Sequence, residues 1–123
     1  MIEQNFIKLY ENSFKKYWEL NALSDYHGDN LFTYGDLARS IARTHLLFEK
    51  MSLAKGDKIA LVGKNHTSWA TVFLSTITYG AVIVPILADF HPESIEHIIN
   101  HSEAKLVFIN KQIWENIDSQ KIN

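Results

Sequence analysis

The stretch "KIALVGKNHTSWATVFLSTITYGAVIVPI" (58–86) decides the fold. Residues 59–62 form a short, uninterrupted apolar run after a Gly-Asp turn, which is typical of a strand buried on both faces of a parallel sheet. Apolar residues then recur at helical spacing, and "AVIVPI" (81–86) predicts a second buried strand. Strand, helix and strand with short connections predict a right-handed βαβ crossover.

The ends of these elements also have sequence signals. Asn65 is a candidate cap for the helix, and Gly80 is a candidate for its left-handed C-terminal residue. Pro85 brings no backbone donor, so it marks where ladder bonding on the second strand can stop. The helix residues expected to pack at i, i+3, i+4 spacing are Trp69, Val72, Phe73, Thr76 and Ile77.

The pattern continues toward the C-terminus. A helix is expected from Pro92 to about Ser102, with Pro92 at its first position and Phe90 and Ile95 spaced as a hydrophobic staple. "LVFI" (106–109) predicts the next strand, and "KQIWENI" (111–117) begins another helix. The fold class is therefore α/β: a parallel sheet with helices on its faces, in a Rossmann-like βαβαβ order.

Two helices are expected before this region. Thr33 followed by Asp36 is a capping-box pattern, with Phe32 and Leu37 spaced as a staple, and it predicts a helix from about 34 to 51. Its expected packing face is Leu37, Ile41, Phe48 and Met51. "NALSDYHGDN" (21–30) is rich in loop-forming residues and predicts a loop.

Residues 2–20 predict an amphipathic helix with an aromatic stripe. The stripe comprises Ile7, Tyr10, Phe14, Tyr17 and Trp18. Such a stripe could lie on a membrane surface or dock a partner, but the polar face of mixed sign favours packing on the rest of the fold. We interpret residues 1–123 as a single α/β unit, in which 1–30 hold the N-terminal helix and loop.

Composition excludes several classes of function. The net charge is −2, and no basic run is longer than Lys15-Lys16. The sequence therefore lacks the cluster of basic residues that binds the phosphate backbone of a nucleic acid. The absence of cysteine excludes disulfides and thiolate chemistry. No window reaches the roughly 18 apolar residues of a membrane span, and the N-terminus lacks the pattern of a secretory signal, so a soluble cytoplasmic protein is expected.

The turn "GKNHTSW" (63–69) does not meet the requirements of a nucleotide-binding motif. A Rossmann fingerprint needs three glycines where this turn has one. A P-loop needs glycine where Lys58 stands and Ser or Thr where Asn65 stands. Asn65 as a helix cap is the better interpretation.

Histidines give no clear site either. His97 and His101 stand four apart with Glu93 one turn earlier, but "HIINH" lacks the glutamate of HExxH enzymes, and Ile95, Ile98 and Ile99 must face the sheet. For His97 and His101, a position on the solvent-exposed face of the helix is favoured over a metal site. The other histidines show no triad spacing: His27, His45, His66 and His91. No catalytic, cofactor-binding or metal-binding residue is assigned to this chain.

Three segments resemble the N-terminal portion of the adenylate-forming superfamily, most of all its long-chain fatty-acid–CoA ligases. They are "LFTYGDLARSIARTHLLFEKMSLAKGDKIALVGKN" (31–65), "NHTSWATVFLSTITYGAVIVPI" (65–86) and "HPESIEHIINHSEAKLVFIN" (91–110). Their order and spacing match from Leu31 to Asn110, and we regard 31–123 as the family-like region of an incomplete large domain.

The resemblance implies two half-reactions for a full-length parent. A carboxylate attacks the α-phosphate of ATP, giving an acyl-adenylate and pyrophosphate, and the thiol of CoA then displaces AMP. It implies ATP, Mg²⁺, CoA and a fatty acid as cofactor and substrates. The family's Ser/Thr/Gly-rich phosphate loop has no counterpart here, because Thr67-Ser68 and Ser75-Thr76 lie inside a predicted helix with no glycines following.

We therefore expect a structural N-terminal part of such a ligase, either truncated from a longer protein or a natural short form. Truncation is favoured, because "SQKIN" (119–123) follows a helix start with nothing that completes the sheet. The chain alone is expected to be inactive and to self-associate through an open sheet edge. The alternative is a stand-alone α/β binding or interaction module without catalytic activity.

Overall fold

The computed structural model describes residues 5–26, 31–64 and 66–123. Its helices are α1 (Phe6–Lys16), α2 (Tyr34–Lys50), α3 (Thr67–Tyr79), α4 (Pro92–Ser102) and α5 (Lys111–Trp114), followed by a 3₁₀ turn at Ser119–Lys121. Its strands are β1 (Asn21–Leu23), β2 (Phe32–Thr33), β3 (Lys58–Gly63), β4 (Val82–Leu87) and β5 (Leu106–Ile109).

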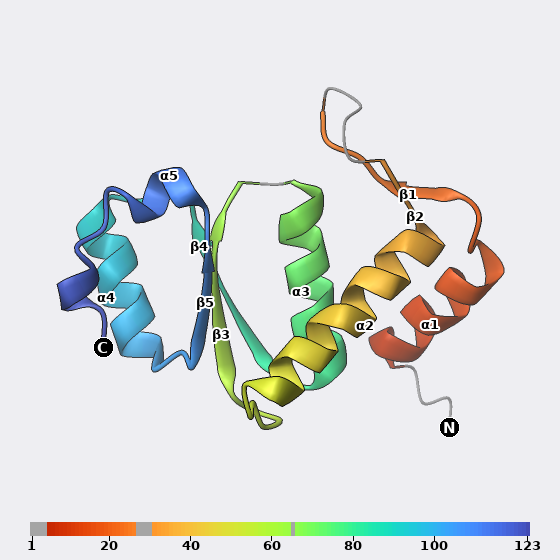
Figure 1. The fold of residues 1–123 in the computed structure, drawn as a ribbon, viewed down its shortest axis with the longest axis horizontal. Helices are drawn as coiled ribbons and strands as arrows, with labels where there is room; N and C mark the ends of the chain where they lie inside the picture. The colour runs from red at the N-terminus through yellow and green to blue at the C-terminus, as the bar shows by residue number, and fades with distance from the viewer. Residues whose placement is uncertain (1–4, 27–30, 65) are drawn as a thin grey trace.

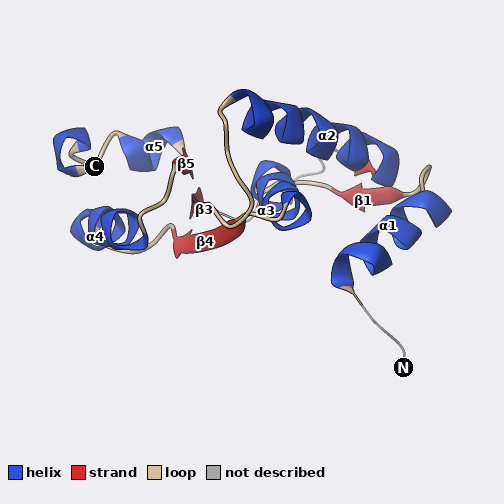
Figure 2. Cartoon of the chain, turned by 90° about the horizontal axis from the view of Figure 1, so that it is seen from below, coloured by secondary structure: helices blue, strands red, loops and turns tan. Residues whose placement is uncertain are grey.

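The main sheet has the order β4-β3-β5, and both pairings are parallel. Figure 1 shows α4 and α5 on one face of this sheet and α3 on the other, with α2 running across α3. In the perpendicular view, α1 lies beside α2 at the end of the molecule farthest from α4 (Figure 2). The predicted α/β class, with crossover helices between parallel strands, is confirmed.

A separate hydrophobic core fills each face of the sheet. On the α4 side, Ile95 and Ile99 pack against Ala60, Val62 and other buried apolar side chains. On the α3 side, Phe48 of α2 is fully buried and clusters with Ile59 and Ala81. Because β3 contributes to both clusters, it is the strand buried on both faces, as its apolar run predicted.

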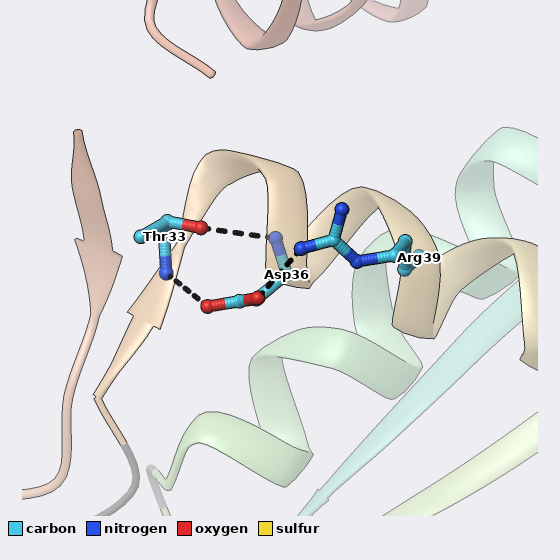
Figure 3. Close-up of polar contacts among 3 residues, drawn as sticks. All are labelled: Thr33, Asp36 and Arg39. Atoms are coloured by element: carbon cyan, nitrogen blue, oxygen red, sulfur yellow. Dashed lines mark hydrogen bonds and ion pairs between the residues drawn. The ribbon is translucent and has the colours of Figure 1, made fainter. Parts of the chain in front are cut away.

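Helix α2 begins at the predicted capping box. Asp36 N–H donates to Thr33 Oγ1 at 3.1 Å, and Thr33 N–H donates to Asp36 Oδ2 at 3.0 Å (Figure 3). Leu37 and Phe48 are buried as expected, but Met51 is 49% exposed. Met51 is the C-cap residue, one position beyond the last residue of α2.

The prediction for residues 81–86 as a buried strand was partly wrong. β4 is an edge strand in the described part of the chain, and Val82 and Leu87 are exposed whereas Ile86 is buried. Pairing also continues past Pro85 to Leu87, because proline lacks a donor but its neighbours still bond to β3.

Helix α3 has the predicted end but a different buried face. Gly80 is left-handed, with φ of 93°. The buried residues are hydroxyl-bearing: Thr67, Thr71, Ser75 and Thr76. The hydroxyls of Thr71, Ser75 and Thr76 each donate to the carbonyl four residues earlier. Since these three hydroxyls do not need water, the residues that carry them bury readily, whereas only Thr76 of the predicted face is buried.

The N-terminal and C-terminal predictions need smaller corrections. Residues 21–23 form β1, which pairs antiparallel with β2, so the predicted loop over 21–30 was wrong there. Helix α1 is shorter than 2–20, and none of its described residues is fully buried. The helix expected from 111 forms one turn, α5. Residues 1–4 and 27–30 and the predicted cap Asn65 lie outside the described residues.

Candidate functional site

Parallel strands β3 and β5 end side by side at the carboxyl edge of the sheet. A pocket of about 220 Å³ opens there, between these strand ends and the first turns of α3. Ligands of α/β folds bind at this edge, so it is the first place to examine for function. Its lining is Leu61, Val62, Gly63, Lys64, His66, Ser68, Trp69, Val72, Phe108, Ile109 and Asn110.

A carboxylate from outside the main sheet lies at the start of α3. Thr67 N–H donates to Asp25 Oδ1 at 3.0 Å, and His66 Nδ1 lies 3.8 Å from the same oxygen. Helix N-termini attract anions because their first N–H groups lack helical partners. Asp25 therefore already places a negative charge where a phosphate would bind, which disfavours nucleotide binding by the turn at 63–69.

Asn110 at this edge joins elements of the fold. Asn110 N–H donates to the carbonyl of Val62 at 3.1 Å, which ties the end of β5 to β3. The Asn110 side chain accepts from Gln112 N–H at 2.8 Å and caps α5. Lys64 is exposed at the rim of the pocket. These contacts hold strand and helix ends in place, and none forms a nucleophile paired with a base.

The histidines singled out in the sequence are dispersed. His97 and His101 are exposed on α4 with their ring centroids 5.7 Å apart, as the apolar stripe beside them predicted. His45 Nε2 lies 3.0 Å from the Ser75 carbonyl and 2.9 Å from Thr78 Oγ1, so it joins α2 to α3. His66 and His91 precede α3 and α4, and His27 lies outside the described residues.

The pKa values of the Asp36 and Glu11 carboxyl groups lie below the ordinary values. The Thr33 backbone N–H, and after it the Arg39 guanidinium, lower the pKa of Asp36. The hydrogen bond from Lys15 lowers the pKa of Glu11. Both carboxyl groups lie on α1 or α2, away from the pocket, so these shifts reflect helix stabilisation.

Asp25 is the residue at this edge that sequence reasoning missed. It stood in a segment interpreted as a loop, and its partner Thr67 is 42 residues away. Nothing local in the sequence indicates such a contact. Among the described residues, no group of three histidine or acidic side chains could hold a metal ion. Within that same part of the chain, no helix has the length and apolar character needed to cross a bilayer.

Known proteins similar to this chain share one kind of chemistry. The putative acyl–CoA ligase YdaB of Bacillus subtilis is 30% identical over 91 residues, which are 74% of this chain and 18% of that protein. A crotonobetaine/carnitine–CoA ligase of Escherichia fergusonii is 32% identical over 85 residues, 69% of this chain and 16% of that protein.

Solved structures share the fold. A mutant coronafacic acid ligase from Pectobacterium brasiliense aligns with a TM-score of 0.87 at 17% identity, over 96% of this chain and 23% of that one. A fatty acyl CoA synthetase from Mycobacterium tuberculosis aligns with a TM-score of 0.79 at 22% identity, over 90% of this chain and 23% of that one.

The matched region is a small part of these proteins. The chain spans less than a fifth of the length of the curated relatives it matches. The family model described as AMP-binding enzyme matches residues 10–123, which takes in every described helix and strand except the first turn of α1. The chain therefore belongs to the AMP-binding enzyme family.

Proposed function

We propose that this chain is the opening part of the large domain of an ATP-dependent acid–thiol ligase. The parent enzyme would join a carboxylic acid to AMP with release of pyrophosphate, and then transfer the acyl group to CoA with release of AMP. The observation that carries this proposal is the family match over 10–123. The names of the relatives, acyl–CoA and carnitine–CoA ligases, agree with it.

Within that enzyme, the proposed role of these residues is to build the scaffold of the site. The carboxyl edge of β3 and β5 has a pocket, but its polar groups do not fit a Mg²⁺–ATP site. Magnesium prefers carboxylate oxygens, and the described residues that line this pocket include no Asp or Glu. No step of the reaction is therefore assigned to a residue of this chain, and the phosphate-binding groups are expected elsewhere in the parent protein.

The proposed acid is a long-chain fatty acid. Support comes from the sequence patterns of 31–110, and a fatty acyl CoA synthetase is among the proteins of the same fold. Relatives named for carnitine and coronafacic acid mark the competing acid classes. Measuring activity with acids of each class distinguishes a long-chain fatty acid from these competing substrates.

The decisive experiment uses the longest protein encoded in frame with these 123 residues. ATP–pyrophosphate exchange is measured with palmitate, octanoate, benzoate and crotonobetaine, each with and without Mg²⁺. Exchange that depends on the acid supports the ligase, and preference for palmitate supports the long-chain assignment. A protein that shows no exchange with any acid, and has no Ser/Thr/Gly-rich loop, would instead be a binding module.

The 123-residue chain provides the matched control. Calorimetry with ATP is expected to give no measurable heat of binding, because the turn at 63–69 lacks a phosphate cradle and Asp25 occupies the start of α3. Micromolar affinity for ATP would contradict the scaffold role while leaving the ligase assignment intact.

A further inference from the structure

Helix α4 carries two imidazoles on its solvent face. His97 and His101 are both exposed, and their rings lie nearly parallel, with an interplanar angle of 16° and centroids 5.7 Å apart. Residues four apart on a helix are surface neighbours, so the two side chains share one patch. Neither ring contributes to the pocket at the carboxyl edge.

The opposite face of α4 is firmly held. Ile95 and Ile99 are 1% and 4% exposed in the core between α4 and the sheet. Asn100 donates through its side chain to the Lys121 carbonyl and accepts from Asn123 N–H. The backbone that carries the two histidines is therefore fixed, whereas their exposed rings can rotate in solvent on a fast timescale.

We propose that His97 and His101 form a two-imidazole chelate for a divalent transition metal, with Cu²⁺ favoured over Zn²⁺. A pair of histidines at i and i+4 on one helix face is the arrangement by which HExxH helices bind zinc. Imidazole nitrogen suits both metals, and copper binds more tightly to a given set of such ligands. Each ring supplies one nitrogen, and water fills the remaining positions.

The local chemistry fits binding without catalysis. Ile98 stands where HExxH enzymes have their general base, so the pair lacks the glutamate that activates a bound water in those enzymes. Glu93, one turn earlier and also exposed, adds negative charge near the pair. The rings must turn from their stacked arrangement to bring both nitrogens about 2.0–2.1 Å from one metal. The site is open and solvated, in keeping with the solvent face expected from the sequence, and it does not depend on the ligase proposal.

The test titrates the 123-residue chain with Cu²⁺ and records the electron paramagnetic resonance spectrum. One equivalent of Cu²⁺ coupled to two imidazole nitrogens is expected. His97→Gln and His101→Gln should each weaken binding about tenfold or more, because a second ligand on the same scaffold raises affinity through its effective concentration. His91→Gln is the matched control, since His91 is exposed and its side chain makes no capping hydrogen bond.

A second measurement needs no variant. Zn²⁺ should protect His97 and His101, but not His91, from modification by diethylpyrocarbonate, read residue by residue by mass spectrometry. The proposal is overturned if both single variants bind Cu²⁺ as tightly as the wild type, or if Zn²⁺ protects neither histidine of the pair.

Discussion

Removing the hydroxyl at the start of α2 should lower the stability of the chain by about 1 kcal/mol. Thr33 Oγ1 accepts the N–H of Asp36 at 3.1 Å, and Thr33→Ala leaves that N–H without its capping partner. Loss of an N-cap hydroxyl costs about 0.5–2 kcal/mol. The middle of this range applies, because the second bond of the box, from Thr33 N–H to Asp36 Oδ2, survives the substitution.

The assay is urea and thermal unfolding at pH 7, followed by circular dichroism. For a chain of this size, 1 kcal/mol lowers Tm by about 4 °C. Thr33→Ser is the matched control, because serine retains the hydroxyl and caps at least as well as threonine. The reasoning is refuted if Thr33→Ala unfolds at the wild-type midpoint, or if Thr33→Ser loses as much stability as Thr33→Ala.

The same box predicts a dependence on pH. The folded-state pKa of Asp36 lies below its ordinary value of 3.8, first because of the Thr33 N–H and then because of Arg39 (Figure 3). The unfolded chain therefore takes up this proton first as the pH falls. The carboxylate's contribution is complete well above pH 3.8 and is lost as the pH falls through the folded pKa. The stability difference between wild type and Asp36→Asn should shrink over that window, and a difference independent of pH would contradict this account.

Three further predictions concern other contacts. Asp25→Ala should cost about 1 kcal/mol in urea unfolding and Asp25→Asn less, because an amide oxygen can still accept the N–H of Thr67; equal losses would contradict the capping role. Gly80→Ala should cost about 1–2 kcal/mol, and so should Gly56→Ala, since both have positive φ; a neutral Gly80→Ala would argue against the strain. Sedimentation velocity should show concentration-dependent self-association, driven by exposed apolar residues such as Phe6, and a clean monomer at high concentration would count against it.

Local signals predicted most of the secondary structure. The Thr33–Asp36 pattern gave the start of α2, the proline at 92 gave the start of α4, and the glycine at 80 gave the end of α3. Each of these depends on atoms within one turn of the residue concerned. The parallel sheet followed from the uninterrupted apolar run of β3.

Features that depend on distant partners could not be predicted. β1 exists because residues 21–23 pair with β2, although their composition favours a loop. The hydroxyl face of α3 is buried because its own carbonyls satisfy the hydroxyls, which no hydropathy pattern indicates. At the candidate site, the pairing of Asp25 with Thr67 joins segments far apart in the chain.

The central place of β3 has a consequence for synthesis on the ribosome. β3 is the first strand of the main sheet to leave the exit tunnel, and both of its neighbours are made after it. β4 emerges next, as soon as α3 is complete, so one side of β3 can pair while β5 is still being translated. Until β5 has been made, the second edge of β3 has no partner within the main sheet, and an unpaired strand edge is prone to aggregation.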